Sequence, residues 1–175
     1  MFKIGKGVEE ILLISFVGPD EPIGILTLQA LVDKLFNNEQ ELLSNYTWYF
    51  IPAADPYGAK LNEGWFKDPY NIKSYILKRF NVKVIEWKLP SSCGDYTFSH
   101  PTLEALAVKK AIDMAKPDLI VPLHNNDFSG LYFFLSRNIP ESVPIHGVDL
   151  KPLTSKYLRM SFTMNKPCVT NTITA

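Results

Sequence analysis

Residues 117–130 read PDLIVPLHNNDFSG: an apolar run of strand length, 119–123, ends at His124 and a polar loop that contains glycine. Residues 11–24 read ILLISFVGPDEPIG, in which a second apolar run leads to Glu21 and another glycine. Continuous apolar runs of this length are typical of fully buried strands. Because α/β folds build their sites outside the carboxyl ends of such strands, we expect Glu21 and His124 to lie together at one edge of a sheet.

Helical and strand patterns alternate along the chain. The spacing of apolar residues predicts helices at 22–37, 71–80, 101–115 and 150–160. Further strands are predicted at 48–51, 82–89 and 131–135. Segments with neither pattern are predicted to be loops, at 52–69, 91–99 and 138–149, and a loop as long as the first often carries function. This order predicts an α/β fold with a mostly parallel, mixed sheet flanked by helices.

The composition is that of one ordinary globular domain. The chain has 175 residues, of which 46% are hydrophobic and 21% charged. Its 18 basic and 18 acidic residues give no net charge, so nothing points to nucleic acid as a partner. The longest apolar run, 11–17, is far shorter than the roughly 20 residues of a membrane-spanning helix. Glu9 and Glu10 precede it, unlike the basic start of a secretory signal, and we therefore expect a cytoplasmic protein that does not bind membranes.

Glu21 and His124 are side chains that zinc accepts as ligands, although catalytic zinc sites usually have three protein ligands. Each residue also has a simpler interpretation. Glu21 is placed to stabilise the start of a helix, and His124 can be a hydrogen-bonded histidine at a strand end. Their shared position after buried strands favours the metal site. Phosphate-binding and dinucleotide-binding glycine loops, the nucleophile elbow and the helical zinc-protease motif are absent from the sequence.

These motifs resemble those of the zinc carboxypeptidases of the M14, carboxypeptidase A-like family. The resemblance covers most of the chain and rests on PDEPIG at 19–24, ADPYG at 54–58 and the stretch 117–125. The family binds zinc through a His-x-x-Glu pair and a later histidine at a strand end. The resemblance therefore implies that Glu21 and His124 are metal ligands. The family's first histidine falls at position 18, where this chain has Gly18.

The resemblance also implies a fold and a mechanism. The fold would be the zinc-carboxypeptidase-like (phosphorylase/hydrolase-like) three-layer sandwich. In the family, zinc polarises the scissile carbonyl, a glutamate acts as general base and arginines hold the terminal carboxylate of the substrate. That base lies well downstream of the second histidine, and nothing in 150–175 matches it. We therefore expect residues 1–175 to be a single catalytic domain of this type that lacks the C-terminal part carrying the base.

Further residues are candidates for a role at the site or lie near it in the sequence pattern. Asn62, Trp65 and Asn125 are the candidates for substrate contact, with a hydrophobic plug beneath the loop as the alternative for Trp65. Arg79 is the one arginine between the two metal motifs, but it falls on a predicted helix and is not assigned to substrate. Three further side chains could supply the missing zinc ligand, although no spacing demands it: Asp20, His100 and His146.

The expected function is that of a zinc-dependent metallocarboxypeptidase, a hydrolase that removes C-terminal residues from peptides, with cell-wall peptides among the candidate substrates. With Gly18 in place of a ligand, we expect weak zinc binding and a weak or inactive enzyme. Two alternatives stay open. One is a non-catalytic binding protein on the same scaffold, with oligomerisation through an exposed sheet edge. The other is a related zinc deacylase or amidase that acts on small N-acyl substrates.

Overall fold

The computed structural model describes residues 1–37, 39–67, 71–80 and 88–125. The chain divides into two compact units. The first contains Met1–Ser91 and Phe98–Asp127, and the second contains Ser92–Thr97 and Phe128–Ala175. Several segments of the sequence analysis lie outside the described residues: most of the predicted strand 82–89, the predicted strand 131–135, the loop 138–149 and the helix 150–160.

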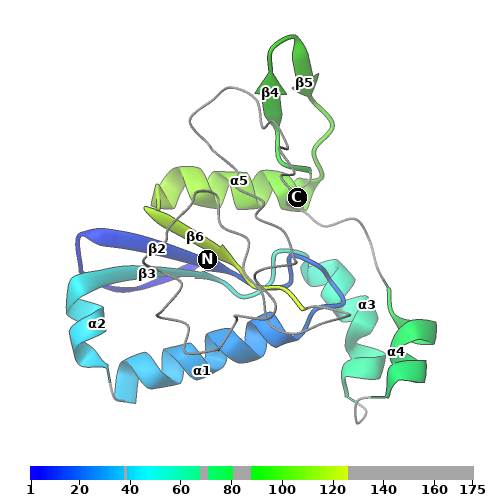
Figure 1. The fold of residues 1–175 in the computed structure, drawn as a ribbon, viewed down its shortest axis with the longest axis horizontal. Helices are drawn as coiled ribbons and strands as arrows, with labels where there is room; N and C mark the ends of the chain where they lie inside the picture. Colours follow the sequence, from blue (N-terminus) through cyan, green and yellow to red (C-terminus); the bar gives the residue numbers. More distant parts are fainter. Residues whose placement is uncertain (38, 68–70, 81–87, 126–175) are drawn as a thin grey trace, which may run out of the picture. The chain divides into compact units, whose positions relative to one another are not determined.

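The first unit contains a mixed, mostly parallel sheet (Figure 1). Its strands are β1 (Phe2–Gly5), β2 (Glu9–Ile14), β3 (Tyr46–Ile51) and β6 (Leu119–Pro122). They are arranged in the order β1-β3-β2-β6. β2 pairs in parallel with both β3 and β6, whereas β1 pairs antiparallel with β3. The predicted α/β class, with a mostly parallel, mixed sheet and helices, is therefore confirmed. The antiparallel partner β1 was not predicted, because its four residues are too short and too exposed to give a pattern.

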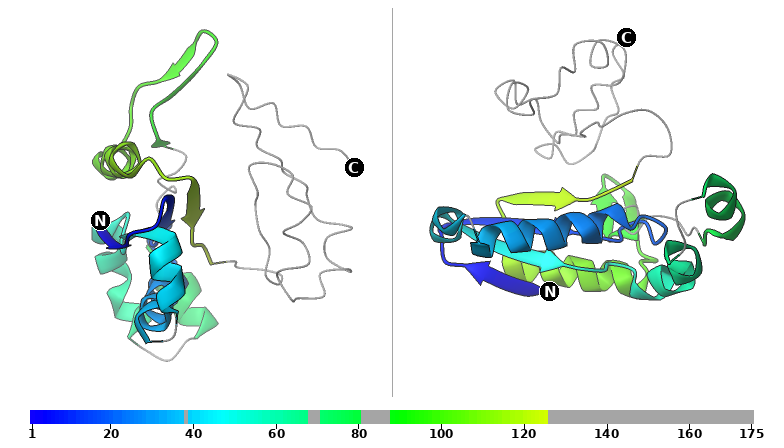
Figure 2. Two further views of the ribbon diagram at one scale, coloured as in Figure 1. Left: turned by 90° about the vertical axis from the view of Figure 1, so that its left-hand side faces the viewer. Right: turned by 90° about the horizontal axis from the view of Figure 1, so that it is seen from below.

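This unit also contains the helices of the described part of the chain. They are α1 (Ile23–Asn37), α2 (Gln40–Asn45), α3 (Pro56–Phe66), α4 (Ile72–Lys78) and α5 (Leu103–Ala115). α1 and α5 pack against opposite faces of the sheet. Figure 2 shows α1 and α5 on opposite sides of the strands. The predicted helices at 22–37, 71–80 and 101–115 correspond to α1, α4 and α5. α5 begins two residues later than Pro101, because the side chain of Thr102 caps it by accepting a hydrogen bond from the amide of Ala105.

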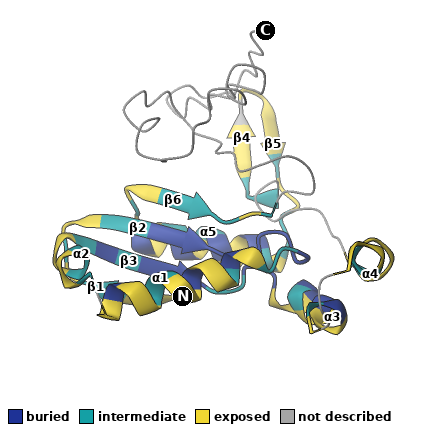
Figure 3. Cartoon of the chain, turned by 60° about the horizontal axis from the view of Figure 1, so that its bottom comes forward, coloured by how far each residue is buried: buried dark blue, intermediate teal, exposed yellow. Residues whose placement is uncertain are grey.

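Alternate residues of the strands form two separate core clusters. Leu12 and Ile14 of β2 face α5 and cluster with its buried residues, three of which are alanines that let the helix approach closely. Leu13 of β2 points the other way and clusters with Leu28 and Leu35 of α1. This alternation follows from the period of two along a strand. The central strands, β2 and β3, are the most buried part of the sheet (Figure 3).

The prediction of a loop over 52–69 was wrong, because residues 56–66 form α3. The helix has clear start signals: Asp55 accepts a hydrogen bond from the amide of Gly58, and Pro56 stands in the first turn. Its buried stripe consists of Gly58, Asn62 and Trp65. Because only one of these three is a large apolar residue, the stripe gives no hydrophobic period.

The prediction of a loop over 91–99 was also wrong. β4 (Ser91–Cys93) and β5 (Tyr96–Phe98) form a two-stranded hairpin, most of which belongs to the second unit. Gly94 has a φ of 56°. A glycine with positive φ at the first of two central residues is the requirement of a tight hairpin turn, and Gly94-Asp95 was the signal for it.

Among the described residues, no helix combines the length and the apolar content needed to cross a membrane.

Gly24 allows α1 to lie close to the ends of β2 and β6. A Cβ atom at this position would lie 2.8 Å from Oγ of Ser15 and 3.1 Å from the carbonyl oxygen of Leu123.

We expect Gly24→Ala to destabilise the fold by about 1–3 kcal/mol through overpacking, despite alanine's higher helix propensity. Gly64 is the matched control, because it is a helical glycine with nothing within 4 Å of an added Cβ. Gly64→Ala should stabilise the protein by up to about 1 kcal/mol. Denaturant unfolding of both variants checks this, and a stabilising Gly24→Ala would contradict it.

Candidate functional site

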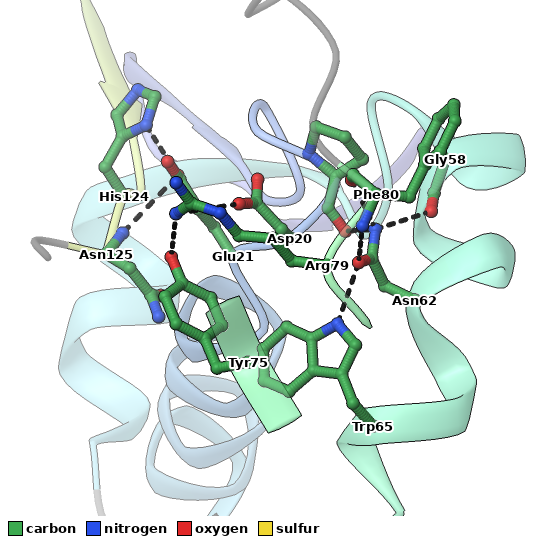
Figure 4. A network of polar contacts seen from close by, with 11 residues as sticks. Asp20, Glu21, Gly58, Asn62, Trp65, Tyr75, Arg79, Phe80, His124 and Asn125 are labelled. Atoms are coloured by element: carbon green, nitrogen blue, oxygen red, sulfur yellow. Dashed lines mark hydrogen bonds and ion pairs between the residues drawn. The ribbon is translucent and has the colours of Figure 1, made fainter. Parts of the chain in front are cut away.

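The side chains of Glu21 and His124 meet at the carboxyl edge of the sheet. Glu21 follows β2 and His124 follows β6, and these parallel neighbours pair Ile14 with Pro122 at their ends. Nδ1 of His124 lies 2.7 Å from Oε2 of Glu21 (Figure 4). The side chain of His124 is 32% exposed, and that of Glu21 is 17% exposed. They therefore lie together as their positions in the sequence led us to expect, and a molecule in solvent can reach them. Their role as metal ligands stays a prediction.

Asn125 connects this pair to the start of α1. Its backbone amide donates to Oε2 of Glu21 at 3.4 Å. Its side-chain Oδ1 accepts from the amide of Ile23, the first residue of α1, at 3.2 Å. The first amides of a helix have no partner within the helix, so an oxygen supplied from elsewhere satisfies one of them. Asn125 therefore has a structural task at the site, and its contact with substrate stays a prediction.

Gly18 lies against the carboxylate of Glu21. The amide of Glu21 donates to the carbonyl oxygen of Gly18 at 3.1 Å, which closes a tight turn. A Cβ atom on Gly18 would lie 2.6 Å from Cδ and 2.7 Å from Oε1 of Glu21. A side chain at position 18 would therefore begin at the Glu21 carboxylate. Position 18 thus lies beside Oε1 of Glu21, and His124 lies beside Oε2.

The described residues supply two candidate zinc ligands at this point and lack a third. No group of three histidine, cysteine, aspartate or glutamate side chains able to hold a metal ion occurs in the part of the chain that the structure describes. Of the other candidates, Asp20 pairs with Arg79, His100 lies 3.3 Å from the hydroxyl of Ser99, and His146 is outside the described residues. Because zinc sites usually need three protein ligands, these residues do not make a complete zinc site.

Arg79 belongs to the same neighbourhood, which the sequence did not lead us to expect. Its Nη1 lies 3.8 Å from Oδ2 of Asp20, whose side chain is only 4% exposed. Nη1 also donates to the hydroxyl of Tyr75 at 2.8 Å, and the guanidinium lies 4.9 Å from the centre of that ring. The position of Arg79 as the one arginine between the two motifs was the signal for it. Its assignment to a helix, of which it is the C-terminal cap, obscured this.

Asn62 and Trp65 lie beneath the site. Their exposed fractions are 0% and 7%. Nε1 of Trp65 donates to Oδ1 of Asn62 at 2.8 Å, and the indole packs edge-on against Phe66 and Tyr75. This is the arrangement that the hydrophobic-plug interpretation of Trp65 predicts. Substrate contact by Asn62 or Trp65 stays a prediction.

We expect Asn125→Ala to destabilise the protein by about 1 kcal/mol, because the first amide of α1 loses its acceptor. Denaturant unfolding measures this. Asn71→Ala is the matched control, since the side chain of Asn71 caps α4 and its loss should cost a similar amount. An Asn125 variant of unchanged stability would contradict the structural task assigned to this side chain.

Comparisons with known proteins give distant likenesses. No protein-family model and no curated protein matches the chain. Among solved structures, it is similar to a metallo-carboxypeptidase from Burkholderia cenocepacia, with a TM-score of 0.43 and 17% identity, over 71% of this chain and 32% of that one. It is also similar to a metallo-carboxypeptidase from Pseudomonas aeruginosa in complex with (2-guanidinoethylmercapto)succinic acid. That match has a TM-score of 0.49 and 13% identity, over 97% of this chain and 44% of that one. The chain thus spans less than half the length of either structure.

Proposed function

We propose that this chain is a zinc-carboxypeptidase-like domain of the three-layer hydrolase type, whose site is reduced to two metal ligands. Those ligands are Glu21 and His124. The observation that carries the proposal is the 2.7 Å distance between Oε2 of Glu21 and Nδ1 of His124, two residues 103 positions apart in the sequence. A carboxylate oxygen and an imidazole nitrogen are both zinc ligands, and two that already face each other need little rearrangement to share one ion.

The position of Gly18 supports the same proposal. A side chain at position 18 would start within 2.7 Å of the Glu21 carboxylate, so it would join the two ligands at one point. With glycine there, zinc is held loosely by two side chains and water. Hydrolysis of C-terminal residues from peptides, with cell-wall peptides among the candidate substrates, is then weak or absent in the chain as given.

A non-catalytic binding protein is the second candidate. It is favoured by the absence of a three-residue metal group among the described residues and by the direct contact of Glu21 with His124. The occupant of the site would then be a peptide or a small N-acyl compound, bound without zinc. Within the described sheet, β1 and β6 are the outer strands. Pairing of two chains through such an edge belongs to this second proposal.

Gly18→His should raise the affinity for zinc. The added imidazole completes a three-ligand site once the flexible end of Glu21 moves aside. We expect a gain of at least about 10–100-fold, the scale on which even the outer partners of metal ligands matter. Isothermal titration with zinc, and elemental analysis after desalting, measure this gain.

Gly18→Phe is the matched control, because it adds a ring of similar size that displaces the Glu21 carboxylate in the same way but carries no ligand atom, so it should give no gain in zinc affinity. Adding His124→Ala to Gly18→His should remove the gain. An affinity that Gly18→His leaves unchanged would mean that position 18 does not face the metal. A wild-type chain that already retains one zinc would mean that a third ligand exists despite Gly18, with Asp20, His100 and His146 as the candidates.

Hydrolysis separates the candidate functions. With zinc added, Gly18→His should release C-terminal residues from a peptide library more readily than the wild-type chain, because its metal site is complete. Mass spectrometry of the products measures this. Release from N-acyl amino acids but not from peptides would favour the deacylase or amidase alternative. Peptide binding by calorimetry without release by either chain would favour the non-catalytic binding protein.

A further inference from the structure

Asn62 is a buried polar side chain with partners on three segments of the chain. It is fully buried, and five polar contacts, in which the two hydrogens of Nδ2 are shared among three carbonyl oxygens, connect it to α3 and to two segments at the site. We infer that Asn62 positions the Glu21–His124 site by holding the backbone on both sides of the Asp20–Arg79 ion pair. This inference rests on the proposed function for the meaning of the site, but its geometry and its test do not require a metal.

The first connection runs to the loop that carries Glu21. Nδ2 of Asn62 donates to the carbonyl oxygen of Pro19 at 3.1 Å. Pro19 is fully buried, and a Cβ on Gly58 of α3 would lie 2.5 Å from the Cβ of Pro19. The helix and the loop therefore touch directly at Gly58 and Pro19. Because Pro19 stands between Gly18 and Asp20, this contact fixes the turn from which the Glu21 side chain projects.

The second connection runs to the residue after Arg79. The amide of Phe80 donates to Oδ1 of Asn62 at 2.8 Å, and the carbonyl oxygen of Phe80 accepts from Nδ2 at 2.8 Å. This two-point contact fixes the backbone of Phe80. Arg79 next to it reaches back to Asp20 at 3.8 Å. Asn62 thus contacts Pro19, next to Asp20, and Phe80, next to Arg79, so it fixes the backbone beside both partners of the ion pair. Figure 4 shows its contacts with Phe80 and the Asp20–Arg79 pair.

The contacts of Asn62 require a side-chain amide at position 62. Oδ1 accepts from two donors, Nε1 of Trp65 and the amide of Phe80, which defines which side-chain atom is oxygen. Nδ2 faces three carbonyl oxygens, those of Pro19, Gly58 and Phe80. Aspartate has the same shape but, when ionised, cannot donate to these carbonyls. An apolar residue would leave buried donors and acceptors unpaired, which is the costly case for a hydrogen bond.

Native-state hydrogen exchange, followed by NMR, tests this inference on the intact chain. In Asn62→Asp we expect the amides of Glu21 and Ile23 to exchange about tenfold faster or more, the scale of one lost buried hydrogen bond. This loss of protection should exceed the change at core amides such as Leu13. Trp65→Phe is the matched control, because it removes one hydrogen bond of Asn62 without touching Pro19. Any loss of protection in that variant should be the same at Glu21, Ile23 and Leu13.

Equal loss of protection at Glu21, Ile23 and Leu13 in Asn62→Asp would overturn the inference, because a residue that only stabilises the fold acts on all amides alike. If Asn62→Asp does not fold, the wild-type chain decides. The amides of Phe80 and Glu21 should open together, with one denaturant dependence, because both depend on Asn62. Separate opening would overturn the inference. Zinc affinity of Gly18→His tests the proposed function separately, so either idea can fail alone.

Discussion

The parallel pairing of β2 with β6 is the constraint on which the candidate site depends. Its register is set at both ends. At the start, the amide of Glu10 donates to Oδ2 of Asp118 while the amide of Asp118 donates to the carbonyl of Glu10, each at 2.8 Å. At the end, the amide of Leu123 donates to the carbonyl of Ile14 at 2.9 Å. A slip of one residue would turn each strand side chain to the opposite face and move His124 away from Glu21.

Much of this arrangement could be predicted from the sequence, because it follows from local patterns. The apolar runs of β2 and β6 indicated buried strands, and the carboxyl ends of parallel neighbours meet at one edge. That was enough to bring Glu21 and His124 together. The apolar spacing of α1 was equally plain, since one side of this helix packs on the sheet.

The missing parts depend on contacts that no local pattern encodes. α3 buries Gly58, Asn62 and Trp65, and a polar residue is an unusual choice for a buried stripe. Asn62 is tolerated there because Pro19 and Phe80 satisfy it, and those partners lie 43 and 18 residues away. The placement of Arg79 depends on the same contacts. The sequence therefore indicated the two side chains that face each other, but not the support beneath them.

The contacts beneath the site also explain why α3 forms although its sequence has a low helix propensity. Two glycines and an asparagine inside α3 cost roughly 2–3 kcal/mol of helix propensity relative to alanine. The cap at Asp55 recovers about 1 kcal/mol, and tertiary contacts must supply the rest. Those contacts are with Tyr75 and Phe80 and with the loop at Pro19, where Gly58 permits close approach and Asn62 binds the backbone. The helix thus depends on the loop that carries Glu21, and the loop depends on the helix. Because each needs the other, the shape of the site and the folding of α3 are one cooperative property of this domain.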